Sequence, residues 1–176
     1  KLIKSGKIII CPTDTVYGLV CDATNKKAVD KIFKIKKRPK SQPLPIFVKD
    51  IKMAKEYSSI NRKQERYLKE VWPGKLTAIL KRNKKALYGI KKETVALRIP
   101  KFKLVIELIE KTKVPLIGTS ANISGQPESI RIKDVLKQFE GKKIQPDFAI
   151  DAGNLKPSNP STIVDIIGER FKIVRK

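Results

Sequence analysis

The sequence predicts a single α/β domain with a mixed sheet, in which parallel and antiparallel strands are flanked by helices. Over most of the chain, short apolar runs rich in β-branched residues alternate with segments whose apolar residues recur at helical spacing. Two strand-like segments close the chain around Gly168, which is typical of a hairpin and makes the sheet mixed. With 176 residues the chain can bury one full core, so we expect one domain over residues 1–176.

Several short apolar segments are expected to be strands of this sheet. The first, residues 8–11, is too short for a buried helix, and Pro12 ends it because proline has no N–H for the strand ladder. Pro43 and Pro45 predict an edge position for a second strand over residues 44–48. Further strands are expected over residues 76–80, 94–99, 116–118, 148–150, 162–167 and 171–174.

Five segments carry the 3.6-residue periodicity of amphipathic helices. In the first, Val29 and Phe33 share one face, and Pro39 predicts the end because the residue before a proline disfavours the α region. In the third, Asn61 and Gln64 have the spacing of a capping box. The helices are expected over residues 28–38, 51–57, 61–72, 104–114 and 132–139.

The charge of the chain is strongly positive: 40 Lys and Arg residues stand against 17 Asp and Glu residues, a formal net charge of +23 at pH 7. A solvated, lysine-rich surface explains such an excess, and so does a polyanionic partner such as RNA or nucleotide phosphates. Affinity for RNA at low salt follows from the charge alone. RNA as a substrate does not follow from it.

Histidine is absent, which excludes histidine-based triads, histidine metal ligands and imidazole general bases. Catalysis must therefore use carboxylates, lysines, cysteines, hydroxyls, a metal or positioning alone. Cys11 and Cys21 match no metal or redox spacing, and Cys11, on a predicted strand, is expected to be a core residue. The protein is therefore expected to be cytoplasmic. No apolar run approaches the ~18 residues of a membrane span.

Two polar segments follow predicted strands, where open α/β sheets usually bind their ligands. Thr13, Asp14, Thr15 and Tyr17 follow the first strand and form either a ligand site or an ordinary capped turn. Residues 119–125 are dense in hydroxyls and carry an amide, which suits a loop around phosphate or, alternatively, a plain turn.

Arg98 interrupts an otherwise apolar strand. An unpaired buried charge is very costly, so this side chain requires an anionic partner. Either a structural Asp or Glu or the carboxylate of a ligand satisfies that requirement.

The common nucleotide-binding motifs are absent: there is no GxGxxG and no GxxxxGK[ST], since GKLT at residues 74–77 lacks the first glycine and follows a predicted helix. Six segments nevertheless resemble the YrdC-like family of L-threonylcarbamoyladenylate synthases, in family order and over essentially the whole chain. They are PTDTVYGL (12–19), KKRP with PL (36–44), WPGKLT (72–77), ALRIP (96–100), TSANISG (119–125) and STIVD (161–165). Any one of them is weak, but six in order are specific.

The resemblance implies a single YrdC-like domain with a twisted, mixed sheet and a basic concave face. It implies a nucleotidyltransferase that joins L-threonine, bicarbonate and ATP into threonylcarbamoyl-AMP and pyrophosphate. That product would serve threonylcarbamoyladenosine formation at position 37 of tRNA through downstream threonylcarbamoyl transferase proteins. Mg²⁺ carried with ATP is the expected cofactor, without a metal site of the protein. The basic face is expected to bind tRNA or double-stranded RNA.

The same resemblance carries the functional positions of the family onto this chain. The KxR and SxN signatures fall on residues expected to be catalytic: Lys36, Arg38, Ser120 and Asn122. L-threonine is expected to bind at Thr15, Arg98, Gly118 and Ser161. ATP is expected to bind at Arg38, Gln42, Thr94, Ser120, Glu128 and Arg175.

Physical roles follow from this assignment. Arg98 would pair with the threonine carboxylate, a bidentate contact that arginine suits better than lysine. Lys36 and Arg38 would neutralise the charge that develops on the leaving pyrophosphate. The chain departs from the family pattern at Phe47, where many members carry histidine, and at Val20, where glycine is common.

Two other functions fit part of the sequence. An RNA-binding or RNP-assembly module with a YrdC-like fold needs a basic face, but it does not need the placement of the KxR and SxN residues. A carbamoyltransferase-type YrdC domain normally lies beside cysteine-rich zinc modules, whose zinc ligands two cysteines cannot provide.

Overall fold

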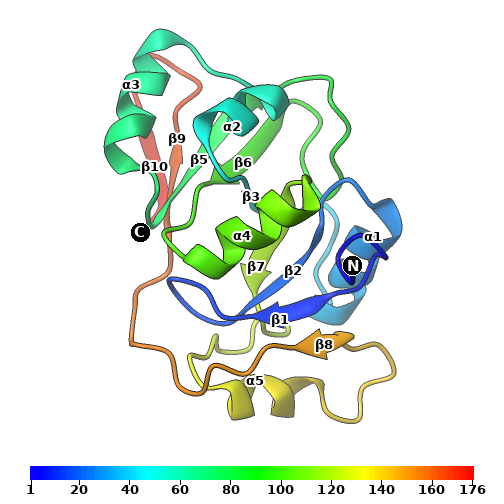
Figure 1. Cartoon of the computed structure of the whole chain (residues 1–176). Helices are drawn as coiled ribbons and strands as arrows, with labels where there is room; N and C mark the ends of the chain where they lie inside the picture. The colour runs from blue at the N-terminus through cyan, green and yellow to red at the C-terminus, as the bar shows by residue number, and fades with distance from the viewer.

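The computed structural model describes residues 1–176 as one sheet with helices packed against it (Figure 1). The strands are β1 (Ile9–Cys11), β2 (Gly18–Asp22), β3 (Ile46–Phe47), β4 (Ser58–Ser59), β5 (Leu76–Arg82), β6 (Thr94–Arg98), β7 (Leu116–Ser120), β8 (Phe148–Ala149), β9 (Thr162–Asp165) and β10 (Lys172–Arg175). The helices are α1 (Lys26–Lys36), α2 (Ile51–Tyr57), α3 (Arg62–Val71), α4 (Lys103–Thr112) and α5 (Ile132–Phe139). The predicted α/β class is confirmed.

The strands form a single mixed sheet in the order β10-β9-β5-β6-β3-β7-β2-β1-β8, with β4 paired to β5 beside this path. The pairs β1–β8, β3–β6 and β5–β9 are parallel. The other neighbours are antiparallel, including the closing β9–β10 hairpin that the sequence predicted. Six of the ten strands therefore have a parallel neighbour that the chain reaches only through a long connection, which fits an α/β fold.

The predicted edge position of the strand near residue 44 is wrong: β3 lies in the middle of the sheet, between β6 and β7. The two prolines are tolerated because the ladder itself covers only residues 46–47, which follow both of them. The carbonyl of Pro45, which proline retains, accepts a hydrogen bond from the Gly118 amide at 3.0 Å. Proline at the entrance of a strand thus does not identify an edge.

Strand β2 was not predicted. All five of its residues are buried, and it pairs antiparallel with both β1 and β7. Its sequence, GLVCD, begins with glycine and ends with aspartate, two residues that are depleted in strands. The apolar run between them is only three residues long.

Local capping sets the helix ends. Asn25 caps α1 by accepting from the Ala28 amide, and Lys37 ends this helix in the left-handed conformation with φ of 49°. Helix α3 begins with the predicted capping box: the Asn61 side chain accepts from the Gln64 amide, and the Gln64 side chain accepts from the Asn61 amide. None of the five helices has the length and apolarity that crossing a bilayer requires.

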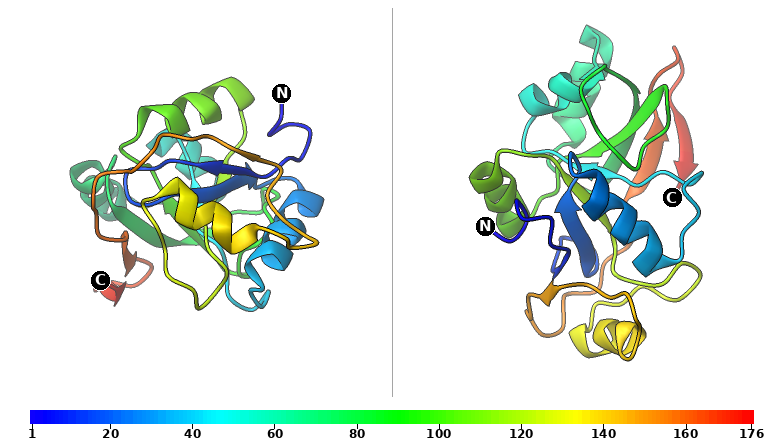
Figure 2. Two further views of the ribbon diagram at one scale, coloured as in Figure 1. Left: turned by 90° about the horizontal axis from the view of Figure 1, so that it is seen from below. Right: turned by 90° about the vertical axis from the view of Figure 1, so that its right-hand side faces the viewer.

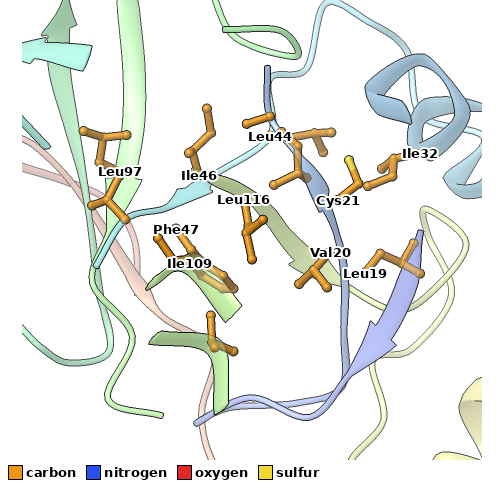
Figure 3. Close-up of a cluster of buried hydrophobic side chains, with 14 of the residues drawn as sticks. Leu19, Val20, Cys21, Ile32, Leu44, Ile46, Phe47, Leu97, Ile109 and Leu116 are labelled. Atoms are coloured by element: carbon orange, nitrogen blue, oxygen red, sulfur yellow. The ribbon is translucent and has the colours of Figure 1, made fainter. Parts of the chain in front are cut away.

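Forty buried apolar residues form one continuous core. Figure 3 shows part of it, where side chains of β2, β3, β6 and β7 meet Ile32 of α1 and Ile109 of α4. Cys11 and Cys21 are both fully buried members of this core, which confirms the prediction for Cys11. Burial raises the pKa of the Cys11 thiol to about 12, so it is an inert apolar side chain.

The two faces of the sheet carry different structures. In the right-hand view of Figure 2, α2, α3 and α4 lie on one side of the central strands. The segments over residues 37–45 and 121–131 lie on the other side, together with β10. In this view α1 also lies opposite α4, so loops and the end of α1 surround the sheet on the second side.

Candidate active site

One pocket of about 950 Å³ opens on the side of the sheet that carries the 37–45 and 121–131 segments. Its strand-borne lining residues alternate along the chain, as residues on one face of a sheet do. They include Thr94, Ala96 and Arg98 on β6, and Ser161, Ile163 and Asp165 along β9. The pocket floor is thus one face of the central sheet, and its walls are loops.

All twelve residues that the family resemblance assigned to catalysis, threonine or ATP line this pocket. They are Thr15, Lys36, Arg38, Gln42, Thr94, Arg98, Gly118, Ser120, Asn122, Glu128, Ser161 and Arg175. They come from segments up to 160 positions apart, from Thr15 to Arg175, and the fold brings them all together. Their individual roles stay predictions.

Lys36 lies buried beneath the loop that follows β7, and only 2% of its surface is exposed. Its ammonium donates to the Ser120 carbonyl (2.6 Å), the Asn122 carbonyl (3.0 Å) and Asn122 Oδ1 (2.8 Å). Burial, with a further contribution from the Arg38 charge, lowers the pKa of Lys36 from 10.5 to about 8, and Glu128 opposes the shift. All three N–H donors are thus engaged by the loop, which Lys36 holds in position. Its predicted role in neutralising the charge on pyrophosphate stays a prediction.

The loop itself is held by further hydrogen bonds. Ser120 Oγ donates to Asn122 Oδ1 at 2.8 Å, and Asn122 Nδ2 donates to the Gln126 carbonyl at 2.6 Å. The Ser124 amide donates back to the Lys36 carbonyl at 2.8 Å. Residues 119–125 are therefore a pinned loop around the Lys36 ammonium and not a simple turn.

Two arginines face the pocket without a carboxylate partner. Arg38 Nε donates to the Gln42 carbonyl (3.0 Å) and Nη2 to the Pro43 carbonyl (3.3 Å), whereas Arg175 Nη2 donates to the Ser161 carbonyl (2.9 Å). Burial and, next, the charge of Arg175 lower the pKa of Arg38. The two positive charges thus repel each other, and an anion bound between the guanidinium groups would relieve that repulsion.

The anionic partner of Arg98, for which the sequence left two alternatives, is the carboxylate of Asp14. Its Nη2 donates to Asp14 Oδ1 at 2.8 Å, its Nε donates to the Gly74 carbonyl at 2.9 Å, and the Lys101 amide donates to Asp14 Oδ2 at 3.0 Å. Nη1 makes no hydrogen bond and belongs to a residue that lines the pocket. The ion pair thus fixes the guanidinium and leaves one of its nitrogens for a ligand.

Hydroxyl groups stand on two sides of the pocket. Thr13 Oγ1 donates to the Val16 carbonyl (2.7 Å), so the Thr15 hydroxyl is the donor in the 3.1 Å contact between the two threonines. Ser161 Oγ lies 3.0 Å from Thr77 Oγ1. Both lining hydroxyls keep lone pairs that can accept hydrogen bonds from a ligand.

Phe47 packs directly on the backbone of Gly118. A Cβ added at Gly118 would lie 2.2 Å from Phe47 Cε2, so only glycine allows this contact. The Phe47 ring lies 5.8 Å from Arg98 Cζ, within the range of a cation–π contact. The aromatic ring therefore forms an apolar wall beside the arginine.

Charged residues in the pocket are mostly basic. Five basic side chains, Lys36, Arg38, Lys91, Arg98 and Arg175, line it with two acidic ones, Glu128 and Asp165. Sequence reasoning assigned no role to Lys91 or Asp165, although Asp165 ends the STIVD motif. It placed Asp14 in a candidate ligand site or capped turn, without identifying it as the partner of Arg98. The excess of positive charge suits an anionic ligand.

Known proteins share both the sequence and the structure of this chain. The Sua5/YciO/YrdC family, described as telomere recombination, matches residues 1–176. A curated protein of Methanocaldococcus jannaschii with the provisional name threonylcarbamoyl-AMP synthase is 38% identical over 176 residues, which is 100% of this chain and 82% of that protein. The threonylcarbamoyl-AMP synthase of Pyrococcus abyssi is 35% identical over 93% of this chain.

The crystal structure of P. abyssi Sua5 complexed with L-threonine superimposes with a TM-score of 0.90 at 33% identity. The match covers 99% of this chain and 51% of the Sua5 chain, and the curated P. abyssi sequence is likewise covered over 48% of its length. The chain thus spans about half of that relative. Because the family pattern covers residues 1–176 and a relative of 38% identity aligns over the whole chain, this protein belongs to the Sua5/YciO/YrdC family.

Proposed function

We propose that this chain synthesises L-threonylcarbamoyl-AMP and pyrophosphate from L-threonine, bicarbonate and ATP. The observation that carries the proposal is the convergence of all twelve motif-assigned residues on one pocket. Relatives named threonylcarbamoyl-AMP synthase support it, as does the Sua5 structure complexed with L-threonine.

The reaction requires two new bonds. The threonine amine bonds to the carbon of bicarbonate with loss of water, and an oxygen of the resulting carbamate bonds to the α-phosphorus of ATP with loss of pyrophosphate. All of the reacting groups except the amine are anionic, so the pocket must gather and orient anions and need not supply a nucleophile. The absence of histidine is compatible with such a reaction.

Threonine is proposed to bind between Arg98, Thr15 and Ser161. Its carboxylate would accept from Arg98 Nη1, the guanidinium nitrogen that makes no hydrogen bond within the protein. The ring of Phe47, which packs on the bare backbone of Gly118, would form an apolar wall beside the methyl group of the substrate.

ATP is proposed to bind on the side of the pocket that carries the two unpaired guanidinium groups of Arg38 and Arg175. Developing charge on pyrophosphate would be stabilised there, while the loop held by Lys36 presents the Ser120 hydroxyl. Thr94, Gln42 and Glu128 complete the proposed ATP contacts.

Mg²⁺ is proposed to enter with ATP, held mainly by the phosphates. No cluster of three or more His, Cys, Asp or Glu side chains that could hold a metal ion occurs in the structure. Glu128 and Asp165 are the carboxylates of the pocket and would offer at most isolated ligands. The ion would neutralise phosphate charge during the transfer.

The product is proposed to serve a downstream threonylcarbamoyl transferase that modifies position 37 of tRNA in the cytoplasm. Mixed anhydrides of this kind are reactive toward water, so the next enzyme must take up the product soon after release. Binding of RNA to this chain is not required for the chemistry proposed.

The deciding experiment is pyrophosphate release by the purified chain with Mg²⁺-ATP, in which threonine, bicarbonate and ATP are each omitted in turn. We expect release only in the complete mixture. Equal release without threonine would contradict the proposal. Threonine-independent turnover of carbamoyl phosphate would support a carbamoyltransferase instead, and RNA binding without any turnover would support an RNA-binding module.

A further inference from the structure

A second hollow of about 580 Å³ lies between α1 and the segment that precedes β8, and it shares no residue with the active-site pocket. Figure 2 (right) shows α1 in front, with this segment running below it. Four lysines and two aspartates line it: Lys27, Lys31, Lys34, Lys143, Asp30 and Asp147. We call it the lysine hollow.

The two aspartates of the lysine hollow are already fully engaged. Asp147 Oδ2 accepts from the Ile8 amide (2.9 Å) and from Lys31 (2.8 Å), and Lys7 lies 3.8 Å from Oδ1. Burial acts to raise the pKa of Asp147, but these contacts together lower it below its usual value. The carboxylate therefore stays ionised and bound to Lys31. The Asp147 carboxylate is therefore paired within the protein.

Asp30 is shared in the same way between two lysines outside the hollow. Lys40 lies 2.6 Å from Oδ1 and Lys26 lies 3.1 Å from Oδ2, and these contacts lower the pKa of Asp30. Counting the lysines bound to the two aspartates, seven ammonium groups surround two carboxylates in and around the hollow. The local excess is therefore five positive charges.

Three lysines of the hollow, Lys27, Lys34 and Lys143, are exposed and form no ion pair. Lys27, Lys31 and Lys34 share one face of α1, at i, i+4 and i+7, and therefore form a row about 10 Å long. Such a row is long enough to face more than one phosphate of a nucleic-acid backbone.

We propose that the lysine hollow binds the phosphate backbone of RNA, as a docking site separate from the active-site pocket. Of its nine lining residues only one is apolar, so it offers little that an anionic membrane surface requires beyond charge. Backbone binding of this kind is independent of sequence and weakens steeply with salt. The proposal does not depend on the reaction in the pocket.

The hollow lies next to the rim of that pocket. Lys40, which Asp30 holds, belongs to the 38–43 segment that also carries Arg38 and Gln42 into the pocket wall. RNA bound in the hollow would therefore lie along α1 toward the pocket. The arrangement would bring a polyanion close to the site without occupying it.

The test compares two triple variants with equal loss of charge. The first carries Lys27→Gln, Lys34→Gln and Lys143→Gln. The matched control carries Lys52→Gln, Lys84→Gln and Lys111→Gln, three exposed lysines without ion pairs that line neither cavity. Binding of a fluorescein-labelled, unstructured oligoribonucleotide is measured by anisotropy between about 50 and 200 mM salt.

We expect the hollow variant to bind roughly 10-fold more weakly at the low end of this range and to lose about two from the log–log salt slope, since three phosphate contacts are removed. The control should change less than about 2-fold. Equal losses in both variants would show that only net charge matters and would overturn the proposal. It would also be overturned by unchanged RNA binding in the hollow variant, or by polyglutamate displacing the labelled RNA as well as unlabelled RNA does. Pyrophosphate release should be unchanged in both variants, so failure of the docking site and failure of the proposed activity are separable.

Discussion

The Arg98 guanidinium donates a 2.8 Å hydrogen bond to the carboxylate of Asp14, 84 positions away, and both side chains are nearly closed to solvent at 4% and 8% exposure. The same two residues also bind the backbone at Gly74 and Lys101. Three separate motifs, PTDT, WPGK and LRIPK, are thereby joined beside the part of the pocket where threonine is proposed to bind. The pair should act on both stability and substrate binding.

Asp14→Asn should lower the free energy of unfolding by about 3 kcal/mol, because it leaves the Arg98 charge buried without its counter-ion. The NH₂ group of the new asparagine would also face another donor, either Arg98 or the Lys101 amide, and one hydrogen bond would be lost. Guanidinium denaturation measures the loss. The exposed Asp134→Asn is the control and should change stability by less than about 0.5 kcal/mol.

A double-mutant cycle with Arg98→Met separates the interaction energy of the Asp14–Arg98 pair from the other effects of each substitution. We expect a coupling energy of at least ~1.5 kcal/mol between positions 14 and 98. Additive losses would show that the ion pair contributes nothing of its own.

Arg98→Ala should weaken threonine binding by at least ~10-fold, about 1.4 kcal/mol, and leave ATP binding nearly unchanged, because it removes the proposed partner of the amino-acid carboxylate. Calorimetry with each ligand alone measures both affinities. A collapse of ATP affinity with threonine affinity intact would move Arg98 to the other side of the reaction.

Gly118→Ala should destabilise the fold by about 2 kcal/mol, since its Cβ would meet the Phe47 ring at 2.2 Å and the ring is confined in the core. The same change at Gly168, where the nearest atom would be 3.9 Å away, is the matched control and should be tolerated. In a Phe47→Leu background Gly118→Ala should cost clearly less. Equal costs in the two backgrounds would show that the ring is not the obstacle.

Helices and most strands of this fold could be predicted because their signals are local. The capping box of Asn61 and Gln64 lies within four residues, and the apolar faces repeat every three or four residues. Strand β2 escaped prediction because its apolar run is short, and β3 was misplaced because prolines at its entrance do not report on its neighbours. Neighbour order in a sheet is a long-range property.

The composition of the site could be predicted from motifs, but its internal contacts could not. Lys36 stands among basic residues at a helix end, a pattern typical of solvent exposure, yet its ammonium binds carbonyls 84 and 86 positions away. The partner of Arg98 was likewise one of two alternatives until the β6 strand and the PTDT turn were brought together. Motifs identify residues, whereas the tertiary fold decides which of their donors remain free.

Arg38→Lys should lower turnover by at least ~10-fold, about 1.4 kcal/mol of transition-state stabilisation, with an unchanged thermal melt. The guanidinium holds two carbonyls, of Gln42 and Pro43, and still has donors that face the pocket, whereas an ammonium is a point charge without that fork. Steady-state kinetics beside a melting curve measure both. Wild-type turnover would reduce Arg38 to a surface charge.

Lys36 should titrate near pH 8, because its ammonium is buried among carbonyl groups. NMR of the lysine Cε carbons across pH 7–11 measures this directly, and the resonance that moves near pH 8 should be missing in Lys36→Met. The substitution removes the charge and keeps a side chain of similar length. If no lysine resonance moves near pH 8, the Lys36 ammonium is solvated and its proposed hold on the loop is wrong.

The same pKa fixes the sign of a stability effect. Between about pH 8 and 10.5 the folded chain holds fewer protons at Lys36 than the unfolded chain, so unfolding takes up a proton and the free energy of unfolding rises with pH. The stability of the wild type relative to Lys36→Met should therefore increase across this window, because the buried charge is relieved. Turnover should move the opposite way, since the neutral amine has only two N–H donors for the three oxygens of Ser120 and Asn122 and the loop loosens. Urea denaturation of both proteins at pH 7.5 and 10, with pyrophosphate release at the same values, tests the two signs together; a relative stability that falls with pH would refute the buried ammonium.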